Sequence, residues 1–340
     1  MTEQGAAIAA VIVAHESAGL LPGCLDSLAR RADGLDLQIV VSESGFTDQT
    51  ETVCREHGAF HLSGPNHGFG AAVNRALGHE AVRRARYVLL INPDAKIVEG
   101  SLSEFVAHSE RRPECGVFGP RLVDQHGRTV CSIGREPSPA NSWLDWRTGW
   151  PDWVWDAGVY ERETRCDWVM GACVLIRRDV LDAVGGFDER FFLFSEETDF
   201  CTRIRRAGWE VAYLPNLTVM HLEAERPLDE HRERLVIWSQ RLYARKWYGP
   251  LDRMSMRLAL LARLTRQLLR RLRRREPARG EWVRLAAALR FRSPLYGPAE
   301  SAPPQSSWAV GRVVTRSQSK ELRNGQEPVA ARAQGGDDPR

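Results

Sequence analysis

The sequence predicts an α/β fold in which helices flank a mostly parallel, Rossmann-like sheet, with a basic helical extension towards the C-terminus. Short apolar runs and amphipathic segments alternate from the N-terminus to about residue 120. Such alternation is typical of parallel strands joined by right-handed crossovers. Beyond residue 230 the pattern becomes helical and rich in arginine. The 340 residues are enough for one large domain and an appendage.

Apolar periodicity places the individual elements. Strands are expected where apolar, β-branched residues run together, and helices where apolar residues recur every three or four positions. The expected strands are 7–13, 37–41, 60–62, 87–91, 117–119, 168–176, 211–214 and the short run 217–220. The expected helices are 17–31, 47–57 and 69–85, with another after Glu197. Residues 131–165 are rich in Trp and Pro and are expected to form a long loop, either as a substrate wall or as irregular packing.

Composition limits the cellular setting. Seven cysteines are scattered without a C-x-x-C pair, which argues against a disulfide framework or structural zinc and favours a reducing compartment. The first residues lack the basic and apolar regions of a signal peptide. No run of about 18 apolar residues exists, so no spanning helix is expected. These observations predict a cytoplasmic catalytic region, with any membrane contact peripheral and on the inner face of the cell membrane.

Two acidic motifs are the most informative feature of the chain. Asn92-Pro93-Asp94 follows the apolar strand 87–91, and the carboxyl ends of such strands are where open α/β sheets bind ligands. The stretch 196–199, Glu-Glu-Thr-Asp, follows an aromatic run and leads into a helix. Taken singly, the first motif is also typical of a turn and the second of helix capping. If both line one cleft, one acid can hold a divalent cation on a diphosphate while the other accepts a proton.

Further motifs accompany these acids in a characteristic order. They are 11–17 (VIVAHES), 43–48 (ESGFTD), 66–74 (NHGFGAAVN), 91–94 (INPD) and 185–191 (GGFDERF) running into 196–199. Together they resemble the family 2 glycosyltransferases with a GT-A fold, and within that family the bacterial rhamnosyltransferases. The resemblance covers residues 7–225. It implies a catalytic domain over residues 1–225. Beyond it, the helical, Arg-rich pattern predicts an extension over 226–292, and the Pro-, Ser- and Gly-rich composition without periodicity predicts a disordered tail over 293–340.

The resemblance also implies binding roles. The residues expected to bind the donor nucleotide are Val13, His15, Glu43, Asn66, Gly68, Asn74 and Asn92. A W-x-x-G-A segment, represented by Trp168, Gly171 and Ala172, would line the sugar and acceptor site. Asp94 and His221 would hold a divalent metal, Mg²⁺ or Mn²⁺, with Asn92 in place of the first Asp of the D-x-D motif. The chain also has Glu43 where the family usually has Asp, and Ala14 where it usually has Asn.

The catalytic base is expected in the acidic stretch. The family usually has Glu-Asp there, so Glu197 takes the Asp position. An inverting transfer requires one carboxylate that accepts the proton of the acceptor hydroxyl. Burial beside the phenylalanines of 191–194 would raise the pKa of that carboxylate towards neutrality. Glu196 and Asp199 are the alternatives, although Asp199 is expected rather to cap the helix or pair with Arg203.

The activity implied by the resemblance is hexosyl transfer in polysaccharide or cell-wall biosynthesis. The first choice is rhamnose from a dTDP donor, moved with inversion onto a lipid-linked glycan such as a polyprenyl-diphosphate acceptor. One alternative keeps the fold and uses a UDP-hexose donor. Another is a non-catalytic module that binds a sugar nucleotide or glycan.

The basic extension allows two interpretations. Residues 251–292 contain thirteen Arg against three acids. An apolar stripe on the expected helix consists of Met254, Leu258, Leu261, Leu264, Leu268 and Leu272. This pattern is typical of an amphipathic helix on anionic lipid, and equally of a solvated basic face on a helix packed against the catalytic domain. No nucleic-acid-binding motif accompanies the arginines, so no nucleic-acid partner is expected.

Overall fold

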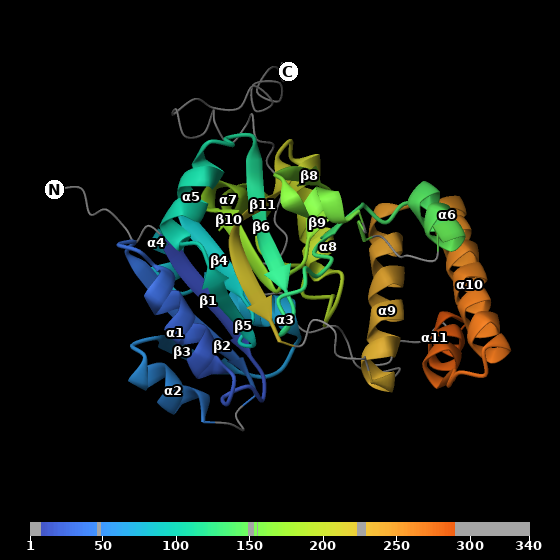
Figure 1. The fold of residues 1–340 in the computed structure, drawn as a ribbon, viewed down its shortest axis with the longest axis horizontal. Coiled ribbons are helices and arrows are strands. Elements are labelled where there is room, and N and C mark those ends of the chain that lie inside the picture. Colours follow the sequence, from blue (N-terminus) through green and yellow to red (C-terminus); the bar gives the residue numbers. More distant parts are fainter. Residues whose placement is uncertain (1–7, 46–48, 149–152, 155, 223–228, 290–340) are drawn as a thin grey trace, which may run out of the picture.

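The computed structural model describes residues 8–45, 49–148, 153–154, 156–222 and 229–289. The predicted tail over 293–340, the expected boundary between 225 and 226, and the motif residues 46–48 lie outside the described residues. A nine-stranded sheet forms the centre of the protein, with the order β3-β2-β1-β4-β10-β6-β11-β5 and β8 paired with β11 (Figure 1). The small strands β7 and β9 form a separate two-stranded sheet.

The strands of the main sheet combine parallel and antiparallel pairs. Their bounds are β1 Ile8–Ala14, β2 Leu37–Ser44, β3 Phe60–Gly64, β4 Tyr87–Ile91, β5 Ala95–Glu99, β6 Cys115–Val123, β8 Thr164–Cys166, β10 Cys173–Arg177 and β11 Glu210–His221. Strands β1 to β4 pair in parallel, as do β6 and β11. Strand β10 is antiparallel to both β4 and β6, so β4, β6 and β11 all point the same way. The small sheet contains β7 Ile133–Gly134 and β9 Trp168–Val169.

Helices cover both faces of the sheet. Those of the sheet region are α1 Leu21–Arg31, α2 Thr50–Glu56, α3 Phe69–Leu77, α4 Glu80–Arg84, α5 Leu102–Glu110, α7 Arg178–Val184 and α8 Glu196–Arg206, with the 3₁₀ turn η1 Ala157–Glu161. Strand β1 is buried on both faces: Val11 and Val13 contribute to the core under α3, α7 and α8, and Ala10 and Ile12 to the core under α1 and α5. This burial explains the uninterrupted apolar runs, which are typical of strands between two helical layers.

Four helices form a group beside the sheet. They are α6 Pro139–Thr148, α9 Glu230–Trp247, α10 Pro250–Arg273 and α11 Arg279–Leu289. In Figure 1, α9 stands between the sheet and α10, and α6 lies along α10. A small core of Ile237, Leu264 and Ala288 joins α9, α10 and α11. Within the described residues, no helix combines the length and apolar composition that a bilayer span requires.

The predicted α/β class is confirmed, and several elements differ from expectation. The helix expected over 69–85 is two helices, because His79 is extended (φ −71°, ψ 141°) and its ring accepts the Ala81 N–H at the start of α4. The strand expected over 168–176 is β9 and β10, which belong to different sheets. The runs 211–214 and 217–220 are parts of one strand, β11, with a register shift between them.

Other elements were not expected at all. Periodicity did not indicate β5, α5 or α7, which at five, nine and seven residues are short for a clear apolar period. The region 131–165, expected to be a loop, contains α6, η1, β7 and β8. Its helix packs against α10 rather than standing alone as a loop wall.

Candidate active site

Residues from two distant strand ends meet at the carboxyl edge of the sheet. Asp94 follows β4, and His221 is the last residue of β11. Nε2 of His221 lies 3.3 Å from Oδ2 of Asp94 and 3.4 Å from Nδ2 of Asn92. The Leu222 N–H donates to the backbone carbonyl of Asp94, which holds the two strand ends together. The structure therefore brings together three residues that were separate motifs in the sequence.

This group has the donor atoms that a divalent cation needs. Asp94 is 7% exposed, and the His221 side chain is 12% exposed. Nδ1 of His221 is buried and has no hydrogen-bond partner among the described residues. The nitrogen that faces Asp94 is Nε2, and an imidazole nitrogen beside a carboxylate oxygen suits a cation such as Mn²⁺. Asp94 and His221 therefore fit the metal predicted for them.

A second cluster of acidic and sulfur ligands lies at the opposite edge of the sheet. Glu114, Cys115 and Glu210 are the one group of three close metal-ligand side chains within the described ranges. Arg165 forms salt bridges with both glutamates, at 3.8 Å and 2.8 Å. Its charge already balances the carboxylates, and the cluster is far from the strand ends that carry the motifs.

The chain enters α8 through a strained turn. Phe194 and Ser195 both have left-handed backbone angles, with φ of 71° and 64°. Residues other than glycine held in that region cost on the order of 1–3 kcal/mol each, and such strain gathers at functional sites. The turn places Glu196 and Glu197 in the first turn of α8. Local sequence gives no reason for this conformation, so the surrounding structure must impose it.

Glu196 is buried and Glu197 half-buried, and each retains an unpaired carboxylate oxygen. Oε2 of Glu196 and Oε2 of Glu197 are each without a hydrogen-bond partner among the described residues. Burial raises the pKa of Glu197, opposed by N–H groups at its own helix start and at Gly171. Burial raises the pKa of Glu196 further, and the neighbouring charge of Glu197 adds to that effect. Raised pKa values of this kind suit a group that must accept a proton near neutral pH.

Gly171 and Ala172 connect the acids to the predicted metal site. A Cβ on Gly171 would lie 3.8 Å from Cβ of Glu197, so the glycine leaves space directly beside that side chain. The carbonyl of Ala172 accepts the N–H of Asn92 at 2.9 Å. One turn between β9 and β10 therefore touches Glu197 on one side and the Asp94 motif on the other. Both acidic motifs lie at one site, as the sequence suggested.

Asp199 is fully engaged in structural contacts. Its carboxylate is 0% exposed and accepts hydrogen bonds from Nε of Arg203 at 3.1 Å and Nε1 of Trp247 at 2.9 Å. Nζ of Lys246 lies 2.7 Å from its Oδ1. The expected pairing with Arg203 is confirmed. The alternative role of Asp199 as base does not fit this geometry, because the carboxylate is fully buried and both of its oxygens are bonded to Arg203, Lys246 or Trp247.

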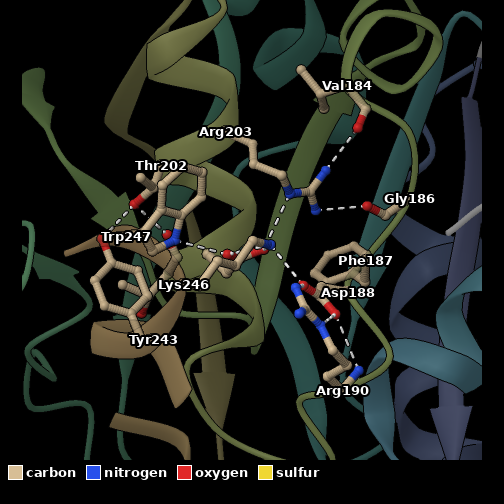
Figure 2. Close-up of polar contacts among 12 residues, drawn as sticks. Val184, Gly186, Phe187, Asp188, Arg190, Thr202, Arg203, Tyr243, Lys246 and Trp247 are labelled. Atoms are coloured by element: carbon tan, nitrogen blue, oxygen red, sulfur yellow. Dashed lines mark hydrogen bonds and ion pairs between the residues drawn. The ribbon is translucent and has the colours of Figure 1, made fainter. Parts of the chain in front are cut away.

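Lys246 links the last turn of α9 to the acidic region, as Figure 2 shows. Its Nζ lies 2.6 Å from Oδ2 of Asp188 as well as contacting Asp199, and both aspartates are 0% exposed. Arg203 adds bonds of 2.8 Å and 2.6 Å to the carbonyls of Val184 and Gly186. Helix α8, helix α9 and the loop after α7 are therefore held by one buried charge network.

Sequence reasoning missed Lys246. A lysine in the last turn of a helix is favourable next to the helix dipole, so its position gave no sign of a partner. A second bond across the same junction joins Oγ1 of Thr202 to the Tyr243 hydroxyl at 2.8 Å. Through these contacts α9, the first helix of the extension predicted over 226–292, is joined to α8 and to the loop after α7.

Asn74 and Gly68 hold a loop rather than face a ligand. Asn74 is 1% exposed, and its amide donates to the Phe187 carbonyl and to Glu189 while accepting the Phe187 N–H. Gly68 has φ of 100°, and a Cβ there would lie 2.4 Å from the Phe192 carbonyl oxygen. The predicted donor contacts of these two residues are therefore replaced by packing against 187–192.

The remaining donor residues line the ends of β1 and β2. Oε2 of Glu43 lies 3.0 Å from Nε2 of His61, a residue that sequence reasoning did not select. Nδ1 of His15 lies 2.6 Å from the Ser44 carbonyl oxygen. Val13 is 9% exposed at the end of β1. A side chain and backbone groups thus gather where a nucleotide would sit, next to the β4 end.

Asn66 and Trp168 have structural partners. Oδ1 of Asn66 accepts the Gly68 N–H at 3.1 Å and shapes the turn before α3. The Trp168 ring is 5% exposed, packs 4.4 Å from the Trp153 ring, and donates through Nε1 to the Arg135 carbonyl. The expectation that Trp168 lines the sugar site does not match this position, because its ring is enclosed by protein.

Known proteins share this sequence pattern and fold. Residues 6–240 match the family described as Glycosyltransferase like family 2. The N-acetylglucosaminyl-diphospho-decaprenol L-rhamnosyltransferase of Mycobacterium tuberculosis (strain ATCC 25618 / H37Rv) is 30% identical over 268 residues, covering 71% of this chain and 87% of that protein. Rhamnosyltransferase WbbL of Escherichia coli (strain K12) is 24% identical over 220 residues, covering 62% of this chain and 81% of that protein.

A solved structure supports the fold. GalNAc-T7 with UDP, GalNAc and Mn2+ aligns with a TM-score of 0.52 at 13% identity, covering 86% of this chain and 59% of that chain. At that identity the likeness concerns the arrangement of strands and helices alone.

Proposed function

The chain belongs to glycosyltransferase family 2, and on that premise we propose that it moves rhamnose from a dTDP-linked donor onto a polyprenyl-diphosphate-linked glycan, with inversion. That it is a glycosyltransferase with the GT-A fold follows from the family match and from its rhamnosyltransferase relatives. The choice of sugar and acceptor rests on the name of the mycobacterial relative, an N-acetylglucosaminyl-diphospho-decaprenol L-rhamnosyltransferase. We place the reaction on the cytoplasmic side of the membrane.

The observation that carries the mechanism is the turn at Gly171 and Ala172. It places Glu197 beside a glycine and ties the same turn to Asn92 at the strand end that carries Asp94. Donor diphosphate and acceptor hydroxyl can therefore meet between these two groups. No other described carboxylate at this edge combines burial with an unpaired oxygen, except Glu196 in the same turn.

We assign proton acceptance to Glu197. Its carboxylate takes the acceptor hydroxyl proton as the hydroxyl oxygen forms a bond to the anomeric carbon, and the bond from that carbon to the diphosphate breaks. Glu196, which is less exposed, supports the position and charge state of its neighbour. Asp94 and His221 would hold the divalent cation, which when bound would neutralise charge on the departing diphosphate. Val13, His15 and Glu43 would contact the nucleotide.

Two variants separate these roles. Glu197→Gln keeps the size of the side chain but cannot accept a proton, so turnover should fall by about 10²–10⁴-fold. Its donor affinity, measured by calorimetry with Mn²⁺, should stay near that of the wild type. Asp94→Ala should instead lose metal-dependent donor binding, which Glu197→Gln should keep.

The comparison variant is Glu196→Gln, which should lower turnover less than Glu197→Gln. Near wild-type turnover in Glu197→Gln, with loss in Glu196→Gln, would assign the base to Glu196. Full activity in both variants would show that neither Glu196 nor Glu197 takes part in catalysis. A panel of dTDP- and UDP-sugars, tested for donor hydrolysis and transfer, decides the donor.

A further inference from the structure

A band of exposed apolar side chains runs along α10. Leu251, Met254, Leu258, Leu269 and Leu272 are exposed by 87%, 55%, 52%, 48% and 48%. Their spacing of three, four, eleven and three residues keeps them on one side of a helix. We call these five residues the α10 face. Helix α6 borders it, because Nε1 of Trp143 donates to Oγ of Ser255 at 3.0 Å.

The structure divides the apolar stripe expected from the sequence. Leu264 and Leu268 are 1% and 4% exposed and point towards the neighbouring helices. Met254, Leu258 and Leu272 lie on the adjacent side of the helix, which is exposed. Packing on α9 and α11 therefore uses only part of the apolar surface of α10. Among the described residues nothing covers the rest.

Exposed apolar residues concentrate in this helical group. Of the twelve large exposed hydrophobic residues in the described part of the chain, nine lie in α6, α10 and α11, and three, Leu20, Phe60 and Val98, lie on the sheet region. Singly exposed apolar residues are ordinary, but a contiguous group marks an interaction surface. Trp143 and Leu144 of α6 extend the group beyond α10.

Positive charge borders the α10 face. Arg270 and Arg273 are exposed next to Leu269 and Leu272, and neither forms a salt bridge with a described residue. Helix α10 contains seven arginines and a single acid, Asp252. An apolar band with a cationic border and a nearby tryptophan is the pattern of helices that lie in the headgroup region of a bilayer.

We propose that the α10 face docks on an anionic lipid bilayer. Leucine side chains would enter the acyl boundary while Arg270 and Arg273 pair with headgroup phosphates. A second copy of the chain is a poorer occupant, because a two-fold contact would set these arginine-rich surfaces against each other. The residues after 289 are also a poorer occupant, since their sequence has more basic than acidic residues.

The proposal deepens the proposed function in one respect. A polyprenyl-linked acceptor is anchored in the bilayer, so a docked enzyme would search for it in two dimensions. The lipid contact itself depends on surface residues alone and can be tested without acceptor.

The test is co-sedimentation of the full-length protein with vesicles. Phosphatidylcholine vesicles with phosphatidylglycerol are compared with phosphatidylcholine alone, at low and high salt. The two test variants are Leu258→Gln/Leu269→Gln and Arg270→Gln/Arg273→Gln. The matched control is Phe60→Gln/Val98→Gln, which removes two similarly exposed apolar residues from the sheet region. All changed side chains are at the surface, and circular dichroism confirms the fold of each variant.

Wild type and control should bind the anionic vesicles and be released by salt, because the attraction is screened. Each test variant should bind about tenfold more weakly or worse, since each basic residue near an anionic surface contributes about fivefold. Equal binding by the test variants and the control would overturn the proposal. So would a dimer of the wild type, seen by light scattering, that Leu258→Gln/Leu269→Gln dissociates.

Donor hydrolysis separates this proposal from the proposed function. Hydrolysis of dTDP-rhamnose in solution should be the same in both test variants as in the wild type. If the wild type hydrolyses donor but does not bind vesicles, only the proposed lipid contact is refuted. If the wild type binds vesicles but hydrolyses no donor, only the proposed function is refuted.

Discussion

Replacing Lys246 with methionine removes the cation that two buried carboxylates share. Asp188 and Asp199 are both 0% exposed, and the lysine side chain is 13% exposed. Methionine has nearly the same length, so the change removes charge and hydrogen bonds with little change in volume. Each aspartate keeps one other cation, Arg190 or Arg203, at 2.6 Å and 3.1 Å.

The expected loss follows from these partners. Removing one member of a buried ion pair costs about 3–5 kcal/mol, because the other charge stays buried without compensation. The remaining arginines reduce that penalty, which places the loss of unfolding free energy at the lower end, about 3 kcal/mol. For a large domain, about 1 kcal/mol lowers the Tm by roughly 2–4 °C, so the Tm should fall by about 6–12 °C.

Activity should fall for a local reason. Asp199 lies in the same first turns of α8 as Glu197, so a looser α9 junction lets the base move. We expect a lower kcat, with donor affinity nearly unchanged because the nucleotide residues lie at the ends of β1 and β2. Lys246→Arg keeps the charge and should restore part of both losses.

The matched control is Arg190→Met. Arg190 contacts the same carboxylate of Asp188 but is 45% exposed and binds one aspartate, whereas Lys246 binds two, so loss of Arg190 should lower the free energy of unfolding less than loss of Lys246. Thermal unfolding at neutral pH, with kcat and KM for donor, provides the comparison. A Tm of Lys246→Met within about 2 °C of Arg190→Met would refute the view that Lys246 holds the acidic region in place.

Three further predictions follow from the same structure. Burial disfavours ionisation of Asp188, but the hydrogen bond from Arg190 and the charge of Lys246 outweigh it and hold the pKa well below its usual range. Its stabilising effect is therefore present above the unfolded pKa and is lost as pH falls through the folded pKa, so acid unfolding of Lys246→Met should begin at higher pH than in the wild type. Burial raises the pKa of Glu196 and Glu197, so the folded state holds protons that the unfolded state releases. The free energy of unfolding should therefore decline as pH rises above about 4.5. The double variant Glu196→Gln/Glu197→Gln should flatten that decline in urea titrations, and an unchanged slope would contradict the raised pKa values. Gly68→Ala should destabilise the protein markedly, because its Cβ would lie 2.4 Å from a backbone oxygen of Phe192. Gly34→Ala, whose Cβ would have nothing within 4 Å, should be destabilised only by the strain of a positive φ. Equal losses of stability in thermal unfolding would count against the close approach of Phe192.

Much of the fold and part of the site could be predicted from local pattern. The apolar run over 87–91 forms a strand that is buried on both faces. Asp94 comes three residues after this strand and therefore lies at the carboxyl edge of the sheet. Asp94 also lies directly before β5, and Ala95 of β5 pairs with His221 of β11, so this strand, which the sequence pattern did not indicate, brings the two side chains together. The structure places Nε2 of His221 3.3 Å from Oδ2 of Asp94, the two residues predicted to hold the metal.

The roles of individual motif residues depended on long-range contacts. Asn74 and Gly68 have the composition of a ligand-binding segment, yet in the structure both pack against the loop 187–192. Trp168 matches an aromatic sugar platform in sequence, but Trp153 encloses it. A motif records residue types and spacing, and neither contains the position of a segment more than a hundred residues away.

Lys246 and the α10 face show the same division. The sequence by itself determined an amphipathic basic helix and a cationic helix end, because periodicity and charge are local properties. Only the tertiary structure decided that Lys246 is buried between Asp188 and Asp199, and that Leu264 faces the core while Leu258 faces outward. Burial and ion pairing depend on which surfaces meet, and that is set by the packing of whole helices against the sheet rather than by any stretch of sequence alone.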